Sequence, residues 1–117
     1  MQNYKDLKVW EKAHSFTLQV YDCTKVFPKE ELYSLTNQLR RAASSIPANI
    51  AEGCGKNSKP EFAHFLNIAL GSANESEYFL ILSKDLLYLK EEIFNTLFNL
   101  INEVKGMLIA LINKVRS

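Results

Sequence analysis

Residues 40–56 read RRAASSIPANIAEGCGK, and their interpretation decides the fold of the whole chain. The stretch combines two arginines, a run of alanine and serine, a proline and two glycines, so it resembles both an active-site loop and a helix. Apolar residues recur every three or four positions from Leu35 to Ile50, which is helical spacing. Pro47 removes the backbone hydrogen bond to the carbonyl of Ala43 and kinks a helix without ending it. We therefore expect the kinked second half of a helix.

Helical spacing continues on both sides of this stretch and predicts four helices, at residues 6–27, 29–53, 59–89 and 91–115. Asp6 is the expected N-cap of the first helix, Pro28 opens the second, and Ser58 with Glu61 forms a capping box before the third. The glycines of residues 53–56 are suited to end the second helix. No stretch alternates with period two. Because short links make consecutive helices antiparallel, we predict an all-α fold: an antiparallel up-down-up-down four-helix bundle, as one domain over residues 1–117.

The composition excludes several classes of protein. The 117 residues carry a formal net charge of +1, which does not suggest a strongly basic nucleic-acid binder. The N-terminus has no apolar signal region, and the longest apolar runs are far shorter than the roughly 20 residues that span a bilayer. Cys23 and Cys54 form no metal or redox motif, so they are interpreted as reduced packing residues of a cytoplasmic protein without a membrane partner.

Two Glu-x-x-His motifs, Glu11 with His14 and Glu61 with His64, are the strongest signal for chemistry. Dinuclear metal carboxylate bundles use such motifs on alternate helices, with a glutamate from each remaining helix. Here the motifs lie off the apolar faces, and the end of the last helix contains no acid, so this function is a distant alternative. No phosphate loop or nucleophile elbow is present. We expect no enzyme, no catalytic residue, no metal or other cofactor, and no small-molecule substrate.

Apolar residues exceed what one core stripe needs. Residues 106–112 are apolar nearly all round, and the third helix carries apolar residues off its main stripe. This surplus fits either a generous core or a second buried face used for self-association.

Small residues at 69–76 match those of the second helix and predict a tight crossing between the second and third helices. Polar groups within such a crossing need partners. Arg40 or Arg41, together with Asn49 and Glu52, is expected to pair with Glu75 or Glu77 as an internal brace, while contact with an RNA or protein partner is the alternative. The brace is the favoured interpretation.

Three segments resemble one bacterial family, the 23S rRNA intervening-sequence proteins: DLKVWEKA at residues 6–13, VYDCTKVFPKEELYSLTNQLRRAASSIPANIAEGCGK at 20–56, and EFAHFLNIALGSANESEYFL at 61–80. The resemblance implies a four-helix bundle whose biochemical role is not established. The family is also similar to the accessory protein of diversity-generating retroelements, a pentameric barrel that binds a reverse transcriptase and nucleic acid. That likeness implies a homo-oligomer, with a homopentamer favoured.

The family motif falls on two helices of this chain, and the resemblance assigns no catalytic role to its residues, which are Arg40, Arg41, Pro47, Asn49, Glu52, Gly53, Phe65, Gly71, Ser72 and Glu75. The chain departs from the accessory protein in its near-neutral charge, because phosphate neutralisation dominates nucleic-acid affinity. The candidate nucleic-acid contacts are Lys5, Lys8, Lys12, Lys56 and Lys59. The leading hypothesis is a non-enzymatic, self-associating interaction protein with a protein or RNA partner, and the rival is an RNA-binding accessory protein that uses this basic end.

Overall fold

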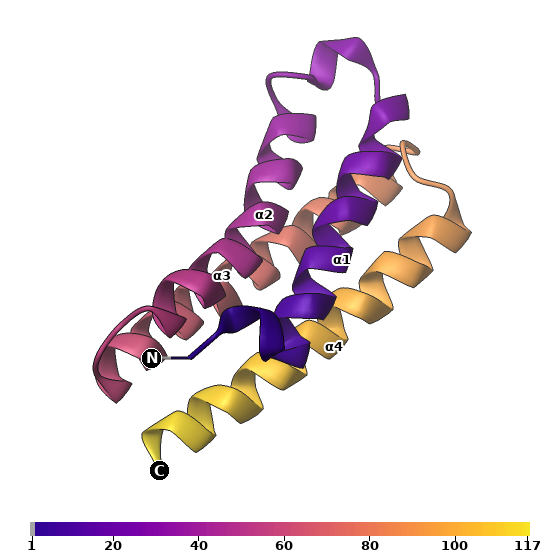
Figure 1. Ribbon diagram of the computed structural model, residues 1–117. Helices are drawn as coiled ribbons and strands as arrows, with labels where there is room; N and C mark the ends of the chain where they lie inside the picture. Colours follow the sequence, from indigo (N-terminus) through magenta and orange to yellow (C-terminus); the bar gives the residue numbers. More distant parts are fainter. Residues whose placement is uncertain (1) are drawn as a thin grey trace.

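The computed structural model describes residues 2–117, in which four long helices account for most of the chain (Figure 1). They are α1 (Lys8–Cys23), α2 (Leu35–Cys54), α3 (Lys59–Asp85) and α4 (Glu91–Arg116), and short 3-10 turns at Tyr4–Asp6, Thr24–Val26 and Lys29–Glu31 precede or link them. Consecutive helices run antiparallel, and α1 also packs on α4, so the four form a closed bundle. The predicted all-α four-helix bundle is confirmed.

The bundle is elongated, with extents of 43 × 24 × 20 Å, and its two ends differ. At the terminal end lie both chain termini, the starts of α1 and α3, and the α2–α3 link. At the tip end lie the α1–α2 connection, residues 24–34, and the α3–α4 connection, residues 86–90. The core runs between these ends and is built mainly from aliphatic side chains with Phe16, Phe27 and Phe94, and it has alanines where α2 and α3 meet.

The start of α1 differs from the expectation that Asp6 is its N-cap. Asp6 belongs to a 3-10 turn, in which the side chain of Asn3 accepts a hydrogen bond from the backbone of Lys5. Leu7 is extended, with φ −85° and ψ 127°, and α1 begins at Lys8 without a side-chain cap. The N-cap prediction was wrong because an Asn capped the preceding turn instead.

The connection from α1 to α2 is longer than predicted. The Thr24 hydroxyl donates to the carbonyl of Val20 at 2.7 Å and ends the regular helix, and Phe27 is extended before Pro28. Pro28 opens only a 3-10 turn, and α2 begins at Leu35 rather than at residue 29. The predicted start was too early because Leu32 fits the helical spacing of apolar residues, yet its side chain is 47% exposed and lies outside the core.

The third helix ends at Asp85, four residues before the predicted end. Leu87 adopts a positive φ of 66°, which side chains other than glycine rarely adopt. The backbone N–H of Tyr88 then donates to the carbonyl of Ser83 at 2.9 Å, as in a Schellman C-cap. The Tyr88 phenol donates to Glu31 at 3.0 Å, which ties the two tip connections together and raises the pKa of Tyr88.

Pro47 lies inside α2 and is buried, so the carbonyl of Ala43 lacks its usual helical donor. The hydroxyl of Thr17, in α1, lies 3.1 Å from that carbonyl oxygen and 2.9 Å from the carbonyl oxygen of Ala13. A single hydroxyl hydrogen is thus shared between its own helix and the gap that proline leaves in the neighbouring one. This contact fixes the height of α1 against α2.

We expect Thr17→Val to lower the free energy of unfolding by about 1–2 kcal/mol, because the buried carbonyl of Ala43 loses its donor. In a Pro47→Ala background an alanine N–H restores the helical hydrogen bond, so the same change is expected to cost less than about 0.5 kcal/mol. A double-mutant cycle from urea unfolding measures the coupling. Equal costs in the two backgrounds would show that Thr17 does not compensate for Pro47.

Candidate interaction surfaces

The α2–α3 crossing is as close as the small residues predicted. Gly53 lies inside α2, and a Cβ placed on it would be 3.0 Å from Phe62 Cδ1 and 3.0 Å from the Cβ of Phe65. Near the middle of α2 and α3, the Ser72 hydroxyl donates to Ser45 Oγ at 3.0 Å. Of the two glycines expected to end α2, Gly55 is the C-cap, whereas Gly53 lies inside the helix, which ends at Cys54, and lets α3 approach.

The internal brace predicted across this crossing does not form. Glu52 pairs with Lys56 at 3.5 Å, and Glu77 pairs with Lys105 of α4 at 3.3 Å. Asn49 donates to the backbone and hydroxyl of Ser45, at 2.8 and 2.9 Å. Serine hydroxyls therefore replace the expected guanidinium–carboxylate pairs, because the helices are too close for long side chains between them.

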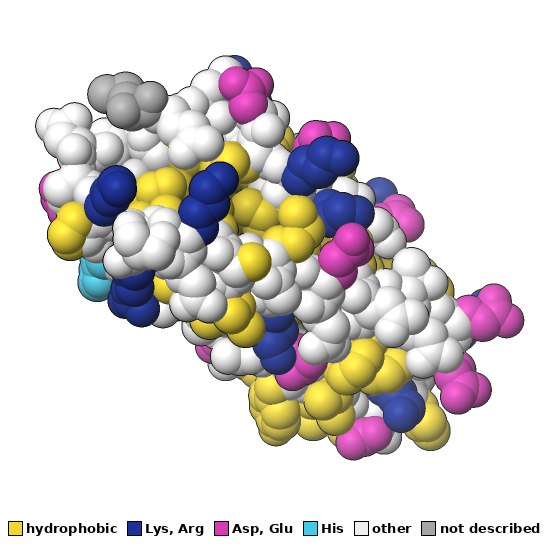
Figure 2. Space-filling view, turned by 90° about the horizontal axis from the view of Figure 1, so that it is seen from below, with side chains coloured by type: hydrophobic (Ala, Val, Ile, Leu, Met, Phe, Trp, Pro, Cys, Tyr) yellow, Lys and Arg dark blue, Asp and Glu magenta, His cyan; other side chains and the backbone are white. Residues whose placement is uncertain are grey.

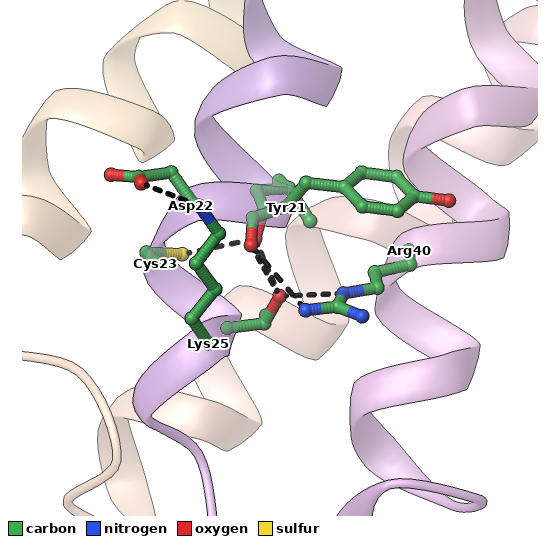
Figure 3. A network of polar contacts seen from close by, with 7 residues as sticks. Tyr21, Asp22, Cys23, Lys25 and Arg40 are labelled. Carbon is green, nitrogen blue, oxygen red and sulfur yellow. Dashed lines mark hydrogen bonds and ion pairs between the residues drawn. The ribbon is translucent and has the colours of Figure 1, made fainter.

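The two neighbouring arginines have different roles. Arg40 Nε donates to the hydroxyl of Thr24 at 2.8 Å, and its guanidinium lies 4.9 Å from the ring centre of Tyr21. A second nitrogen donates to the carbonyl of Tyr21 at 3.4 Å, so Arg40 closes the C-terminal end of α1 (Figure 3). Arg40 thus joins α1 to α2, rather than α2 to α3 as predicted.

Arg41 points into a polar groove of about 500 Å³ between α2 and α3, and Ser45, Ser72 and Glu75 also line it. Within residues 2–117 neither Arg41 nor Glu75 has an oppositely charged group within 4.0 Å, and both are exposed. The family motif therefore divides into residues that hold the fold and residues that face solvent.

A second groove, of about 470 Å³, lies between α1 and α4 on another side of the bundle. Leu18 and Ile93 give it an apolar lining, and Asp22 and Glu92 lie at its edge. Cys23 also lines it, and burial, the largest cause, raises the pKa of its thiol to about 11. The thiol is therefore protonated at neutral pH and acts as a packing group, not as a nucleophile.

Large exposed hydrophobic side chains concentrate in the tip half of the bundle: Leu18, Tyr21, Val26, Leu32, Tyr33, Tyr78, Ile81, Leu86, Leu87 and Ile93. Tyr33 is 91% exposed and Leu87 is 89% exposed. Ile68 and Ile109 lie nearer the terminal end. Figure 2 shows such apolar patches between charged side chains on one face. Of the surplus noted in the sequence, Ile68, Ile81 and Ile109 are exposed, whereas Leu70, Leu82, Met107 and Leu111 pack against the core.

Basic side chains gather at the terminal end, where Lys114 and Arg116 of α4 join those predicted from the sequence. In Figure 2 the dark-blue side chains are most frequent toward this end, at the left, and the magenta ones toward the other. Lys12 pairs with Glu103 at 3.1 Å, and Lys56 lies 5.2 Å from the ring centre of Phe65. The other predicted nucleic-acid contacts are Lys5, Lys8 and Lys59, and these lysines form no ion pair with any described residue.

The two Glu-x-x-His motifs are engaged in local contacts. His14 stacks on Trp10 at 4.9 Å between ring centres, and His64 meets Phe65 edge-on. Glu61 accepts from Ser58 at 3.0 Å in the predicted capping box. Residues 2–117 bring together no group of three His, Cys, Asp or Glu side chains suited to a metal ion.

The fold and these surfaces define a four-helix bundle with a polar groove between α2 and α3 and an apolar groove between α1 and α4. In the described part of the chain no helix is both long and apolar enough to cross a membrane. The model of the 23S rRNA-intervening sequence protein family matches residues 5–110, so the chain belongs to this family and the resemblance is confirmed.

A solved structure supports the assignment. A crystal structure from Bacteroides thetaiotaomicron, described as a protein with unknown function from the S23 ribosomal protein family, shares 32% sequence identity. It superimposes with a TM-score of 0.83 over 90% of this chain and 95% of that chain. No curated protein matches the sequence. The biochemical role of the family is not established.

We expect Arg40→Ala to lower the free energy of unfolding by about 1–2 kcal/mol, because the hydroxyl of Thr24 and the ring of Tyr21 lose their charged partner. Arg41→Ala is a control at the adjacent position and is expected to change stability by less than about 0.5 kcal/mol. Urea unfolding of both variants at one protein concentration provides the comparison. Equal losses would contradict the division of roles between the two arginines.

Proposed function

We propose that the protein is a non-enzymatic interaction module that works as a homo-oligomer in the cytoplasm. The observation that carries this proposal is the concentration of exposed leucine, isoleucine, valine and tyrosine side chains over the tip half of the bundle. Exposed apolar groups favour burial: a fully exposed Leu, Ile or Val side chain gains up to roughly 1.5–3 kcal/mol when it is completely covered, and a half-exposed one gains correspondingly less. The likeness to the pentameric accessory protein supports five copies.

The size of the chain is compatible with such an assembly. Its accessible surface is 6860 Å², and a standard interface removes about 800 Å² from each partner. Two such contacts per copy would leave most of the surface free for a further protein or RNA partner. Reduced, free Cys23 and Cys54 agree with a cytoplasmic location.

We expect light scattering coupled to size-exclusion chromatography to give a mass near five times the 13.4 kDa of one chain. Replacing Tyr33 and Leu87 together by serine tests whether the most exposed apolar residues contribute, and we expect a lower oligomer mass or a dissociation constant raised about tenfold or more. A matched double change of the exposed Asn99 and Asn102 to serine is the control. A wild-type mass of one chain at micromolar concentration would overturn the proposal.

Binding of structured RNA is the second candidate function, favoured by the basic side chains at the terminal end. Seven Lys and Arg residues lie there with five Asp and Glu residues, namely Lys5, Lys8, Lys12, Lys56, Lys59, Lys114 and Arg116 with Asp6, Glu11, Glu52, Glu61 and Glu103, which pairs with Lys12. The local excess is small, but an oligomer with its terminal ends on one side would multiply it. Phosphate contacts of this kind make affinity fall steeply with salt.

We expect the change of Lys8 and Lys59 to glutamate to weaken retention of a structured RNA at low salt and to reduce the salt dependence of the remaining binding. The slope of log K against log salt is expected to fall by roughly 1.5–2 when two phosphate contacts are lost. Lys29 and Lys90, at the tip end, changed in the same way are the matched control. No RNA binding by the wild-type protein at low salt would remove this candidate.

A further inference from the structure

We infer that the polar groove between α2 and α3 binds an extended segment of a partner protein in which an acidic residue stands directly next to a basic residue. Arg41, on the α2 side, receives the acidic side chain, and Glu75, on the α3 side, receives the basic one. The inference rests on the proposed role as an interaction module and names the chemistry of its protein partner.

Arg41 and Glu75 lie on opposite sides of this groove at nearly the same height. The hydrogen bond between Ser45 and Ser72 marks a level that α2 and α3 share. From that level, Arg41 lies four residues, or about 6 Å, toward the tip end of α2. Glu75 lies three residues, or about 4.5 Å, toward the tip end of α3. The two residues therefore differ in height by only about 1.5 Å.

The two charged side chains nevertheless do not pair with each other. Both are exposed, and within residues 2–117 neither has an oppositely charged atom within 4.0 Å. The side chains that line the groove between them are small and buried or half-buried: Ala42, Ser45 and Ser72. The hollow of about 500 Å³ therefore leaves room for one ligand that contacts both charges at once.

An extended peptide matches this arrangement of charges. Successive side chains of a strand point to opposite sides and are separated by about 3.3 Å along the chain. An acidic residue next to a basic residue therefore directs one charge to Arg41 and the other to Glu75. Neighbouring residues of a helix are only about 100° apart around its axis, so a helical segment does not present such a pair to both sides of the groove.

The uncharged side chains of the groove are suited to a peptide backbone. Asn37 and Gln38 are exposed on the tip side of Arg41, and each amide has both donors and an acceptor. A peptide group likewise has one donor and one acceptor. Along α2 the groove extends from Asn37 to Ser45, about 12 Å, which is the length of three or four extended residues.

Two other occupants match the groove less well. A phosphate chain offers acceptors and negative charge, so Arg41 would attract it while Glu75 would repel it. A second copy of this chain has no suitable segment among residues 2–117, because each pair of neighbouring acidic and basic residues there lies in a helix, in a 3-10 turn or at the start of a helix. A segment of a different protein is therefore the occupant.

Fluorescently labelled hexapeptides with blocked ends provide the test, and fluorescence anisotropy measures their binding. Gly-Ser-Asp-Lys-Ser-Gly and Gly-Ser-Lys-Asp-Ser-Gly present the charged pair in both orders, and Gly-Ser-Asn-Gln-Ser-Gly is the uncharged control. We expect one or both charged probes to bind the wild-type protein with a Kd below about 1 mM and about tenfold more tightly than the control. Equal affinity for the charged and uncharged probes overturns the inference.

Reversal of each charge tests which side of the groove holds which side chain. Arg41→Glu is expected to weaken binding of the charged probes about tenfold and to strengthen binding of a probe with Lys-Lys in their place about tenfold. Glu75→Lys is expected to exchange the preference in the same way for Asp-Asp. Lys90→Glu and Glu92→Lys make the same changes of charge at exposed positions outside the groove, and as matched controls they are expected to change affinity less than about twofold.

Other results also overturn the inference. If the control variants alter binding as much as the groove variants do, the peptides respond to net charge and not to the groove. If labelled oligouridine binds while the peptides do not, and Arg41→Glu weakens that binding, the groove holds a phosphate chain. Light scattering of each sample separates this inference from the proposed self-association. A monomeric wild type that binds the peptides defeats only the self-association, whereas an assembled wild type that does not bind them defeats only this inference.

Discussion

The shared hydrogen bond between Thr17 and the carbonyl of Ala43 determines how the first two helices meet. Pro47 leaves that carbonyl without a donor in the core, and an unsatisfied carbonyl there costs about as much as a lost hydrogen bond. Only a short hydroxyl side chain at one height of α1 satisfies it, so the contact sets the register of α1 on α2. Apolar packing alone would tolerate a small slide along the helix axis, but a hydrogen bond at 3.1 Å does not.

The same segment of α2 also determines how closely α3 approaches. Alanine, serine and glycine along this side of α2 bring the two backbones together, until Ser45 and Ser72 hydrogen-bond and Gly53 touches two phenylalanines. Long charged side chains do not fit into such a crossing. They are displaced to its margins, which leaves Arg41 and Glu75 unpaired on the surface. The tight internal contact thereby creates the charged outer surface.

Sequence periodicity was sufficient for the helices, their order and the close crossing, because each depends on local spacing and side-chain size. It failed where a choice depended on a distant partner. Arg40 and Arg41 are identical in sequence terms, and only the position of α1 makes one of them bind Thr24. The start of α2 was misplaced because Leu32 continues the helical spacing of apolar residues upstream, although its side chain is exposed in the structure. Gly53 and Gly71 likewise differ only in what lies next to them.

The residues of this motif that are unfavourable in a helix differ in how their cost is offset. Pro47 and Gly53 are costly in an isolated helix, and Thr17 together with the approach of α3 offsets their cost within the chain. Gly71 costs less than Pro47, and at Gly71, as at Gly106, no atom lies within 4 Å of a Cβ built on the residue. The positive φ at the exposed Leu87 is also a cost, because asparagine or glycine would adopt that backbone more easily, and the C-cap hydrogen bond from the Tyr88 N–H to the Ser83 carbonyl offsets it.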